Sequence, residues 1–319
     1  MLDRIGTGFA LVIAALLLLA TRVEADRMTS PAELGQVDWL RHYDAAQRAS
    51  AASGKPIFLL FQEVPGCATC VGFGNEVLSH PRLVEAIEDE FVPLAILNNV
   101  GGHDREVLGR FGEPAWNNPV VRFVYAKGDD LLPRRDRVWA EGAITGRMVD
   151  ALEAAGRPVP RYLVALRDEL APSRIERATL SMACYWVGEA CLGGIDGLLS
   201  SRAGHLGGRE VVEVRFDPAR VSYGQLVQQA FRNGCADGVF AHDDTQLRIA
   251  RTIYPSSAKP APGVARDAGP RDQLYHLKRN VPLAALEATP AERLRLNHAA
   301  WKKQDPTPLL SPRQRSALE

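Results

Sequence analysis

A pair of cysteines behind a short apolar run is the feature that most constrains this chain. Ile57–Phe61 is uniformly apolar, a Pro65-Gly66 step follows, and Cys67 and Cys70 come next with two residues between them. The apolar run predicts a buried strand, and the Pro-Gly step predicts a turn. The first cysteine is therefore expected at the start of a helix, where free N–H groups and the helix dipole lower the pKa of a thiol.

The elements after this pair alternate between helices and strands. A helix is predicted over Pro81–Glu90, with proline at its opening, and a strand over Phe91–Leu97. Pro119 breaks the chain just before a strand over Val120–Tyr125, and a helix over Ile144–Ala155 closes this half. The order is strand, cysteine pair, helix, strand, proline-led strand and helix.

This order resembles that of thioredoxin-fold proteins, over about residues 37–170. Cys67 and Cys70 match the redox-active pair of that family, and Pro119 matches its cis-proline, which faces the pair. The resemblance implies a three-layer α/β domain in which the first cysteine attacks and the second resolves. A permanent disulfide or half of a metal site is the alternative, but the metal site would need two further ligands, and no metal is expected.

A second cysteine block follows a proline-containing boundary at residues 171–173. Ile175–Ala183 reads as a strand that leads into Cys184, and two aromatic residues, Tyr185 and Trp186, come directly after the cysteine. A lone cysteine at a strand-to-helix junction occupies a position that favours the thiolate. The block therefore predicts a reactive thiol with an apolar wall beside it.

The chain from Ile175 to about Phe231 resembles peptide methionine sulfoxide reductase A, an α/β family. Cys184 matches the cysteine that attacks the sulfoxide sulfur. Tyr185 and Trp186 match the aromatic pair that encloses the methyl group of the substrate, and Glu189 matches an acidic residue on the same helix. The resemblance implies that these four residues form a catalytic and substrate-binding cluster.

Glu210 completes the resemblance, because it stands seven residues before an Asp-Pro step as the catalytic glutamate of the family does. Oxygen leaves the sulfoxide only when protonated, and this carboxylic acid is expected to supply the proton. The glycine-punctuated residues 197–205 match a loop of the family. A shortened segment before the glutamate and Leu247 in place of a tyrosine remove two tyrosines that hold the oxygen in the family.

Oxygen transfer would leave Cys184 as a sulfenic acid, which a second thiol must resolve. Cys191 would lie about 10 Å further along one helix, beyond disulfide reach, and is expected to be a small buried apolar residue. Cys235 is the candidate resolving cysteine. The alternative is that Cys67 and Cys70 act as a built-in reductase.

The N-terminus predicts an exported protein. Phe9–Ala20 is an apolar run of twelve residues, too short to span a membrane and typical of a signal peptide, with cleavage expected after Ala25. An uncleaved N-terminal membrane anchor is the alternative. The body is thus expected to be periplasmic or secreted, where a membrane-borne thiol donor could supply electrons.

The charge balance gives no reason to propose nucleic acid or an anionic membrane surface as a partner. The 38 basic and 38 acidic side chains give a formal net charge of zero, so nothing favours nucleic acid. No complete nucleotide-binding fingerprint is found, and no cofactor is expected. The expected organisation is a signal peptide over 1–25, a thioredoxin-like domain over 26–170, a reductase A-like α/β domain over 171–272 and a tail without catalytic signature over 273–319.

The leading hypothesis is an exported thiol-dependent oxidoreductase. It would reduce peptide methionine S-sulfoxide through Cys184, with electrons relayed by Cys67 and Cys70, and its partners would be oxidised proteins or peptides and a thiol electron donor. One alternative is a general thiol–disulfide oxidoreductase with a degenerate C-terminal domain. The other is a non-catalytic module that binds oxidised peptides.

Overall fold

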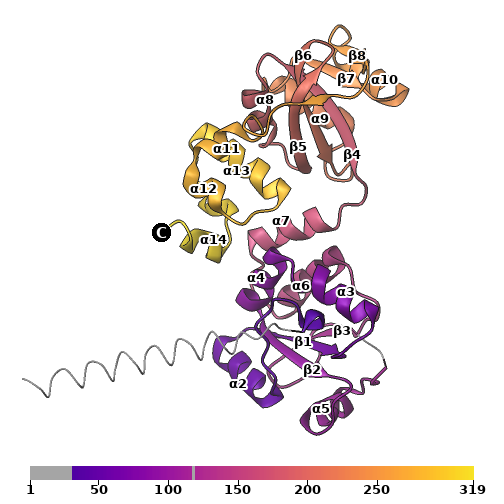
Figure 1. Cartoon of the computed structure of the whole chain (residues 1–319), viewed down its shortest axis with the longest axis vertical. Helices are drawn as coiled ribbons and strands as arrows, with labels where there is room; N and C mark the ends of the chain where they lie inside the picture. Colours follow the sequence, from indigo (N-terminus) through magenta and orange to yellow (C-terminus); the bar gives the residue numbers. More distant parts are fainter. Residues whose placement is uncertain (1–30, 117–118) are drawn as a thin grey trace, which may run out of the picture.

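The computed structural model describes residues 31–116 and 119–319 and shows two lobes joined by helix α7 (Arg161–Leu170) (Figure 1). The predicted signal peptide lies outside the described residues. Within 31–116 and 119–319, no helix has the length and apolar character needed to cross a membrane.

The first lobe is built on a three-stranded sheet in the order β2–β1–β3. Its strands are β1 (Ile57–Gln62), β2 (Val92–Leu97) and β3 (Val120–Val124). The central strand β1 runs parallel to β2 and antiparallel to β3. The helical elements of this lobe are η1 (Ala32–Leu34), α2 (Tyr43–Ser53), α3 (Ala68–Glu76), α4 (Pro81–Glu90), α5 (His103–Phe111) and α6 (Glu141–Ala154).

Helices cover both faces of this sheet, because β1 is apolar on both. Phe58 and Leu60 pack into the cluster formed with α3, α4 and α6. Ile57, Leu59 and Phe61 point to the other face and pack with α2 and α5. Since successive side chains of a strand face opposite ways, a strand buried at every position needs two helical layers. The predicted three-layer α/β arrangement is confirmed.

The second lobe holds a six-stranded sheet in the order β8–β7–β4–β6–β5–β9, antiparallel except for the parallel pair β7 and β8. The strands are β4 (Glu176–Met182), β5 (Leu198–Leu206), β6 (Arg209–Phe216), β7 (Gly238–Ala241), β8 (Ala258–Pro260) and β9 (Arg266–Asp267). Three helices belong to this lobe: α8 (Tyr185–Leu192), α9 (Tyr223–Arg232) and α10 (Asp244–Ile253).

Strand β5 corrects the expectation of a glycine-punctuated loop at residues 197–205. It pairs along β6 as a hairpin whose two-residue turn is Gly207-Gly208, with φ of 55° and 74°. Positive φ at both positions is what a tight hairpin turn requires, and glycine adopts it without steric cost. The small residues Ser200, Ser201 and Gly204 concealed the strand in the sequence.

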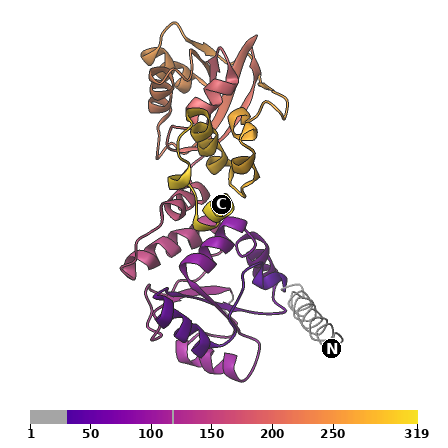
Figure 2. The ribbon, with the colours of Figure 1, turned by 90° about the vertical axis from the view of Figure 1, so that its left-hand side faces the viewer.

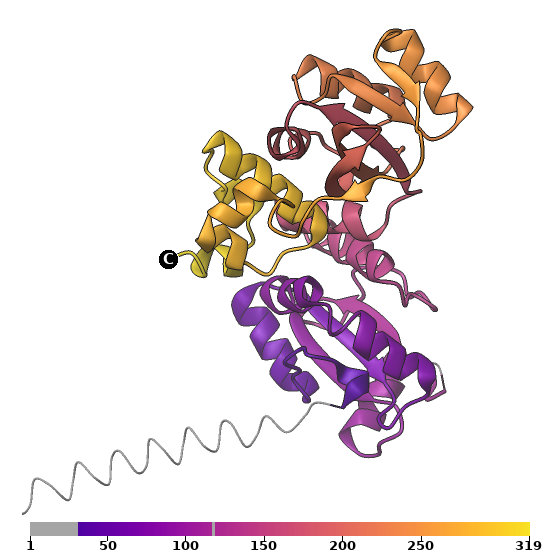
Figure 3. The same ribbon diagram turned by 45° about the horizontal axis from the view of Figure 1, so that its top comes forward.

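The C-terminal residues, for which a tail that is helical in parts is predicted, form a compact unit of short helices around α13. Its elements are α11 (Tyr275–Arg279), α12 (Val281–Ala285), α13 (Pro290–Lys302), η2 (Thr307–Leu309) and α14 (Pro312–Ser316). Figures 2 and 3 show this unit packed beside α7, between the two lobes. Helix α13 contacts both α8 and β5.

Arg82 of α4 anchors this unit to the first lobe. Its guanidinium is 2% exposed, pairs with Glu85, and donates to Glu292 of α13 at 3.0 Å and to Ser311 at 3.2 Å. Removing one partner of a buried ion pair is strongly destabilising because it leaves an uncompensated charge. The C-terminal unit thus holds the two lobes together.

Candidate active sites

The cysteine pair of the first lobe lies where β1 leads into α3. Cys67 is the N-cap residue of α3 and is exposed, whereas Cys70 is buried one turn later. Their sulfur atoms lie 3.5 Å apart. The Glu33 carboxylate accepts a hydrogen bond from the N–H of Gly66 at 2.7 Å, which fixes the turn before the pair. This is the geometry of a reduced pair of thiols placed to form a disulfide.

The two thiols differ in acidity. Hydrogen bonding from the N–H of Cys70 to the sulfur lowers the pKa of Cys67. Burial raises the pKa of Cys70 to about 11. The thiolate is the nucleophile, so Cys67 has the attributes of an attacking thiol and Cys70 those of a resolving one.

Pro119 lies at the same end of the sheet. The pairing of Phe61 with Val120 places it beside the end of β1 that leads to Cys67. Its carbonyl accepts a hydrogen bond from the indole N–H of Trp139 at 3.0 Å. The peptide bond before Pro119 involves a residue outside the described ones, so its cis geometry stays a prediction.

The second site lies at the junction of β4 and α8. Cys184 is partly exposed and is the N-cap residue of α8, with extended backbone angles. The β4–β6 register pairs Met182 with Glu210. One carboxylate oxygen of Glu210 accepts the N–H of Tyr185 at 2.7 Å. A carboxyl group is thereby fixed within one residue of the thiol.

Aromatic rings surround this junction. The ring of Tyr185 meets Trp186 at 6.1 Å between centroids and His205 of β5 at 5.5 Å, both in edge-to-face geometry. Such pairs are favourable because the ring edge is positive and the face is negative. The predicted aromatic wall exists and has His205 as an additional member.

The hydroxyl of Tyr185 shares this site with several acidic groups. Burial raises the pKa of Tyr185, and the negative charges of Asp272, Glu210 and Cys184 raise it further. Sequence reasoning missed His205 and Asp272. His205 could have been identified from the Gly207-Gly208 turn, because a two-residue hairpin turn there places His205 directly opposite Glu210.

Glu189 does not occupy the position expected of a substrate-binding residue. Its side chain is completely buried, and its oxygens accept hydrogen bonds from the Ser201 hydroxyl at 2.8 Å and the N–H of Leu274 at 2.6 Å. Burial raises the pKa of Glu189. The side chain faces inward because α8 packs on β5 and on the C-terminal unit. Its two hydrogen bonds link β5 to the start of that unit.

Cys235 also differs from the expectation of a resolving cysteine. It forms a disulfide with Cys191, with Cα atoms 5.2 Å apart and both side chains buried. The pairing joins the end of α8 to the loop after α9. Spacing along one helix could exclude a bond between Cys184 and Cys191, but only tertiary structure brings Cys191 and Cys235 together. Neither thiol is free to resolve Cys184 while this bond is intact.

The two thiol sites are in different lobes, with α7 and the C-terminal unit between α3 and α8 (Figure 1). Among the described residues, no hydrogen bond, ion pair or disulfide connects α3 with α8. An exchange between the sites within one molecule would therefore need the lobes to rearrange.

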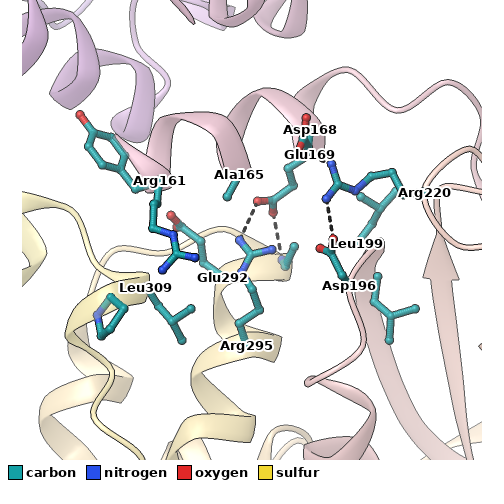
Figure 4. Close-up of a pocket in the computed structure, with 15 residues that line it drawn as sticks. Arg161, Ala165, Asp168, Glu169, Asp196, Leu199, Arg220, Glu292, Arg295 and Leu309 are labelled. Atoms are coloured by element: carbon teal, nitrogen blue, oxygen red, sulfur yellow. Dashed lines mark hydrogen bonds and ion pairs between the residues drawn. The ribbon is translucent and has the colours of Figure 1, made fainter. Parts of the chain in front are cut away.

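A cavity of about 260 Å³ lies away from both thiols, at the joint between α7, α13 and the chain entering β5 (Figure 4). Most of its charged groups are paired: Glu169 with Arg295 at 3.4 Å, Arg220 with Asp196 at 2.8 Å and with Asp168, and Glu292 with Arg82 of α4. The arrangement serves the joint between the lobes and offers no reactive group.

Comparisons with known proteins show which families the chain resembles. Residues 38–126 match the family model described as thioredoxin-like. A peptide methionine sulfoxide reductase MsrA from Geobacter metallireducens is 33% identical over 90 residues, covering 23% of this chain and 51% of its own length. Its counterpart from Methanothermobacter thermautotrophicus is 36% identical over 110 residues, covering 24% of this chain and 65% of its own length.

This chain thus combines a thioredoxin-like domain with a region similar to methionine sulfoxide reductase A, and it spans about half to two thirds of the length of these relatives. Among solved structures, a DsbH oxidoreductase is 18% identical, with 40% of this chain and 91% of that chain covered and a TM-score of 0.33. The oxidised form of Mxr1 from Saccharomyces cerevisiae is 21% identical, with 37% and 90% covered and a TM-score of 0.28.

Proposed function

We propose that the second lobe reduces methionine sulfoxide in oxidised proteins or peptides, with Cys184 as the nucleophile and Glu210 as the acid. The observation that carries the proposal is the 2.7 Å hydrogen bond between the Glu210 carboxylate and the N–H of Tyr185, the residue after Cys184. It holds a carboxyl group beside a thiol at a helix N-terminus, which supports Glu210 as the candidate acid. Similarity to reductases named for this activity supports the same reading.

The chemistry follows from these groups. The Cys184 sulfur attacks the sulfoxide sulfur, and the oxygen accepts a proton from Glu210 as its negative charge develops. The net step converts the thiol and the sulfoxide into a Cys184 sulfenic acid and a thioether. The aromatic wall of Tyr185 and Trp186 encloses the methyl group on the same sulfur.

The sulfenic acid returns to a thiol by two exchanges. The Cys67 thiolate attacks the Cys184 sulfur and expels the oxygen as water, which forms a mixed disulfide. Cys70 then attacks Cys67, which releases Cys184 and leaves a Cys67–Cys70 disulfide for an external thiol donor to reduce. Because the two sites lie in different lobes, we propose that the first exchange takes place between two molecules.

Export belongs to the same proposal. The Phe9–Ala20 apolar run supports a periplasmic or secreted protein, with a membrane-borne thiol as donor. The Cys191–Cys235 disulfide is the kind of bond that persists in an oxidising compartment.

One assay tests the chemistry directly. The mature protein is incubated with the separate enantiomers of methyl p-tolyl sulfoxide and dithiothreitol, beside Cys184→Ser and Cys67→Ser. Loss of the S enantiomer that needs Cys184 and not Cys67 is the expected result. Turnover that persists in Cys184→Ser, or its absence from the intact protein, would refute the proposal.

A second candidate function, general thiol–disulfide exchange by the first lobe, is favoured by the unequal acidity of Cys67 and Cys70. Insulin reduction that needs Cys67 and not Cys184, without sulfoxide turnover, would establish it. Binding of sulfoxide peptides without either activity would indicate a recognition module instead.

A further inference from the structure

A segment of the C-terminal unit lies directly on the aromatic wall of the Cys184 site. We call residues Asp272–Tyr275 the strap. The Asp272 carboxylate accepts a hydrogen bond from the indole N–H of Trp186 at 3.1 Å. The ring of Tyr275 stacks on the indole of Trp186, with centroids 4.1 Å apart and ring planes 10° from parallel. The strap therefore covers one face of the indole and accepts the hydrogen bond of its only donor, the ring N–H.

The strap is itself held from both sides. The amide side chain of Gln273 accepts from the N–H of Ala203 and donates to its carbonyl, both at 2.8 Å. The N–H of Leu274 donates to the buried carboxylate of Glu189. Leu274 has a φ of 49°, a left-handed conformation that a leucine keeps only where its surroundings determine it.

These contacts leave Trp186 little freedom. Its indole is fixed by a stack on one face, by a hydrogen bond at its nitrogen and by a T-shaped contact with Tyr185. Trp186 is two residues from Cys184 in the chain, so its orientation sets the apolar wall beside the thiol. A wall fixed before the ligand arrives lowers the entropy cost of binding.

We propose that the strap orients Trp186, and that Tyr275 and Asp272 are positioning residues for the methyl group of the sulfoxide substrate. The proposal rests on the proposed function of Cys184. Neither residue takes part in the transfer of oxygen or protons. Their loss therefore weakens substrate binding and leaves the chemical step intact, which is the signature of a change in KM with an unchanged kcat.

The test compares two stacked pairs of the same lobe. Tyr275→Ala removes the stack on Trp186. Tyr254→Ala, the matched control, removes the stack between Tyr254 and Phe231, whose centroids lie 3.9 Å apart with planes 13° from parallel. Tyr275→Phe keeps the stack, and Asp272→Ala removes the indole acceptor while leaving the stack in place. Each variant is made in the full chain.

Two readouts decide the outcome. Fluorotryptophan is incorporated at the five tryptophans, and the ¹⁹F resonance of Trp186 is assigned through Trp186→Phe. We expect Tyr275→Ala and Asp272→Ala to move this resonance, with Tyr275→Phe and Tyr254→Ala leaving it in place. We also expect Tyr275→Ala to raise KM for methyl p-tolyl sulfoxide about tenfold, the factor that corresponds to loss of a strong aromatic pair.

An unmoved Trp186 resonance in Tyr275→Ala, or an unchanged KM, would overturn the proposal, as would an equal rise of KM in Tyr254→Ala. Absence of turnover in the unmodified protein would refute the proposed function separately. In that case the Trp186 resonance still decides whether the strap orients the indole, and its titration with dimethyl sulfoxide replaces KM.

Discussion

Cys67 and Cys184 both cap a helix that follows a strand, yet their surroundings prepare them for different chemistry. Cys67 has a second thiol 3.5 Å away, and the nearby Glu33 carboxylate binds the N–H of Gly66, which precedes the helix. Cys184 has no thiol partner among the described residues, but Glu210 binds the first N–H of its helix.

The difference shows what a helix N-terminus does and does not determine. Both cysteines cap the end of a helix where backbone N–H groups point outward, and hydrogen bonding there lowers the pKa of Cys67. A neighbouring thiol allows Cys67 to form a disulfide, with the loss of two electrons. Cys184 instead has a carboxyl group and an aromatic wall beside it, and the proposed reaction with a sulfoxide rests on these surroundings.

The largest expected effect comes from removing the acid of the Cys184 site, a change that should leave the Cys67 site unaffected. Glu210→Gln keeps an acceptor for the N–H of Tyr185 and removes the proton. We expect kcat for methyl p-tolyl sulfoxide to fall by about 10² to 10⁴, the usual contribution of a general acid. Steady-state kinetics measure it, and insulin reduction through Cys67 should be unchanged. Equal rates in the variant would remove Glu210 from the mechanism.

The next effect concerns the disulfide, which holds the far end of the helix that Cys184 caps. Cys191→Ala with Cys235→Ala opens a loop of sequence separation 44, which should cost about 4 kcal/mol of stability in the second lobe. Hydrogen exchange measured by mass spectrometry should show earlier exchange in β4 and α8. Unaltered exchange in α3 serves as the control, and an unaltered second lobe would contradict the prediction.

A third effect tests the difference in thiol pKa between Cys67 and Cys70. Because burial raises the pKa of Cys70 to about 11 and hydrogen bonding lowers that of Cys67, iodoacetamide at pH 7 should alkylate Cys67 at least about a hundredfold faster than Cys70. Peptide mapping over a time course measures both rates. Because the pKa of Cys67 is lowered, its rate should level off at a lower pH than that of an ordinary cysteine thiol. Comparable rates for the two cysteines would eliminate the division into attacker and resolver.

The smallest effect concerns Glu189 beneath the Cys184 site. Its pKa is raised by burial, so the folded protein binds its proton more tightly than the unfolded chain. The contribution of Glu189 to folding stability is fully present at pH values below the pKa of an ordinary glutamate. It is lost as the pH rises through the pKa of Glu189 in the folded protein. Thermal unfolding of Glu189→Gln should depend less on pH from 4 upward than that of the unmodified protein. Parallel pH profiles would contradict this prediction.

Much of the first lobe could be predicted because its signals are local. The apolar run at Ile57–Phe61, the cysteine pair and the proline at Pro81 each identify an element without reference to distant residues. Helix α5 (His103–Phe111) escaped prediction, although glycines stand at both its ends.

The second site could be predicted only in part, because tertiary contacts complete it. Cys184, Trp186 and Glu210 were found from a resemblance and lie together. Tyr275 could not be found, since it lies far along the chain and reaches Trp186 only through the turn at Leu274. The Cys191–Cys235 disulfide was missed for the same reason.

The most direct test of the contrast between the two sites is a single turnover trapped with dimedone, a reagent for sulfenic acids. Reduced Cys67→Ser/Cys70→Ser protein is mixed with one equivalent of S methyl p-tolyl sulfoxide, and peptides are mapped for the adduct. We predict a dimedone adduct on Cys184, formed in step with the sulfide product and absent from Cys184→Ser. Sulfide formed without an adduct on Cys184, or no sulfide at all, would contradict it.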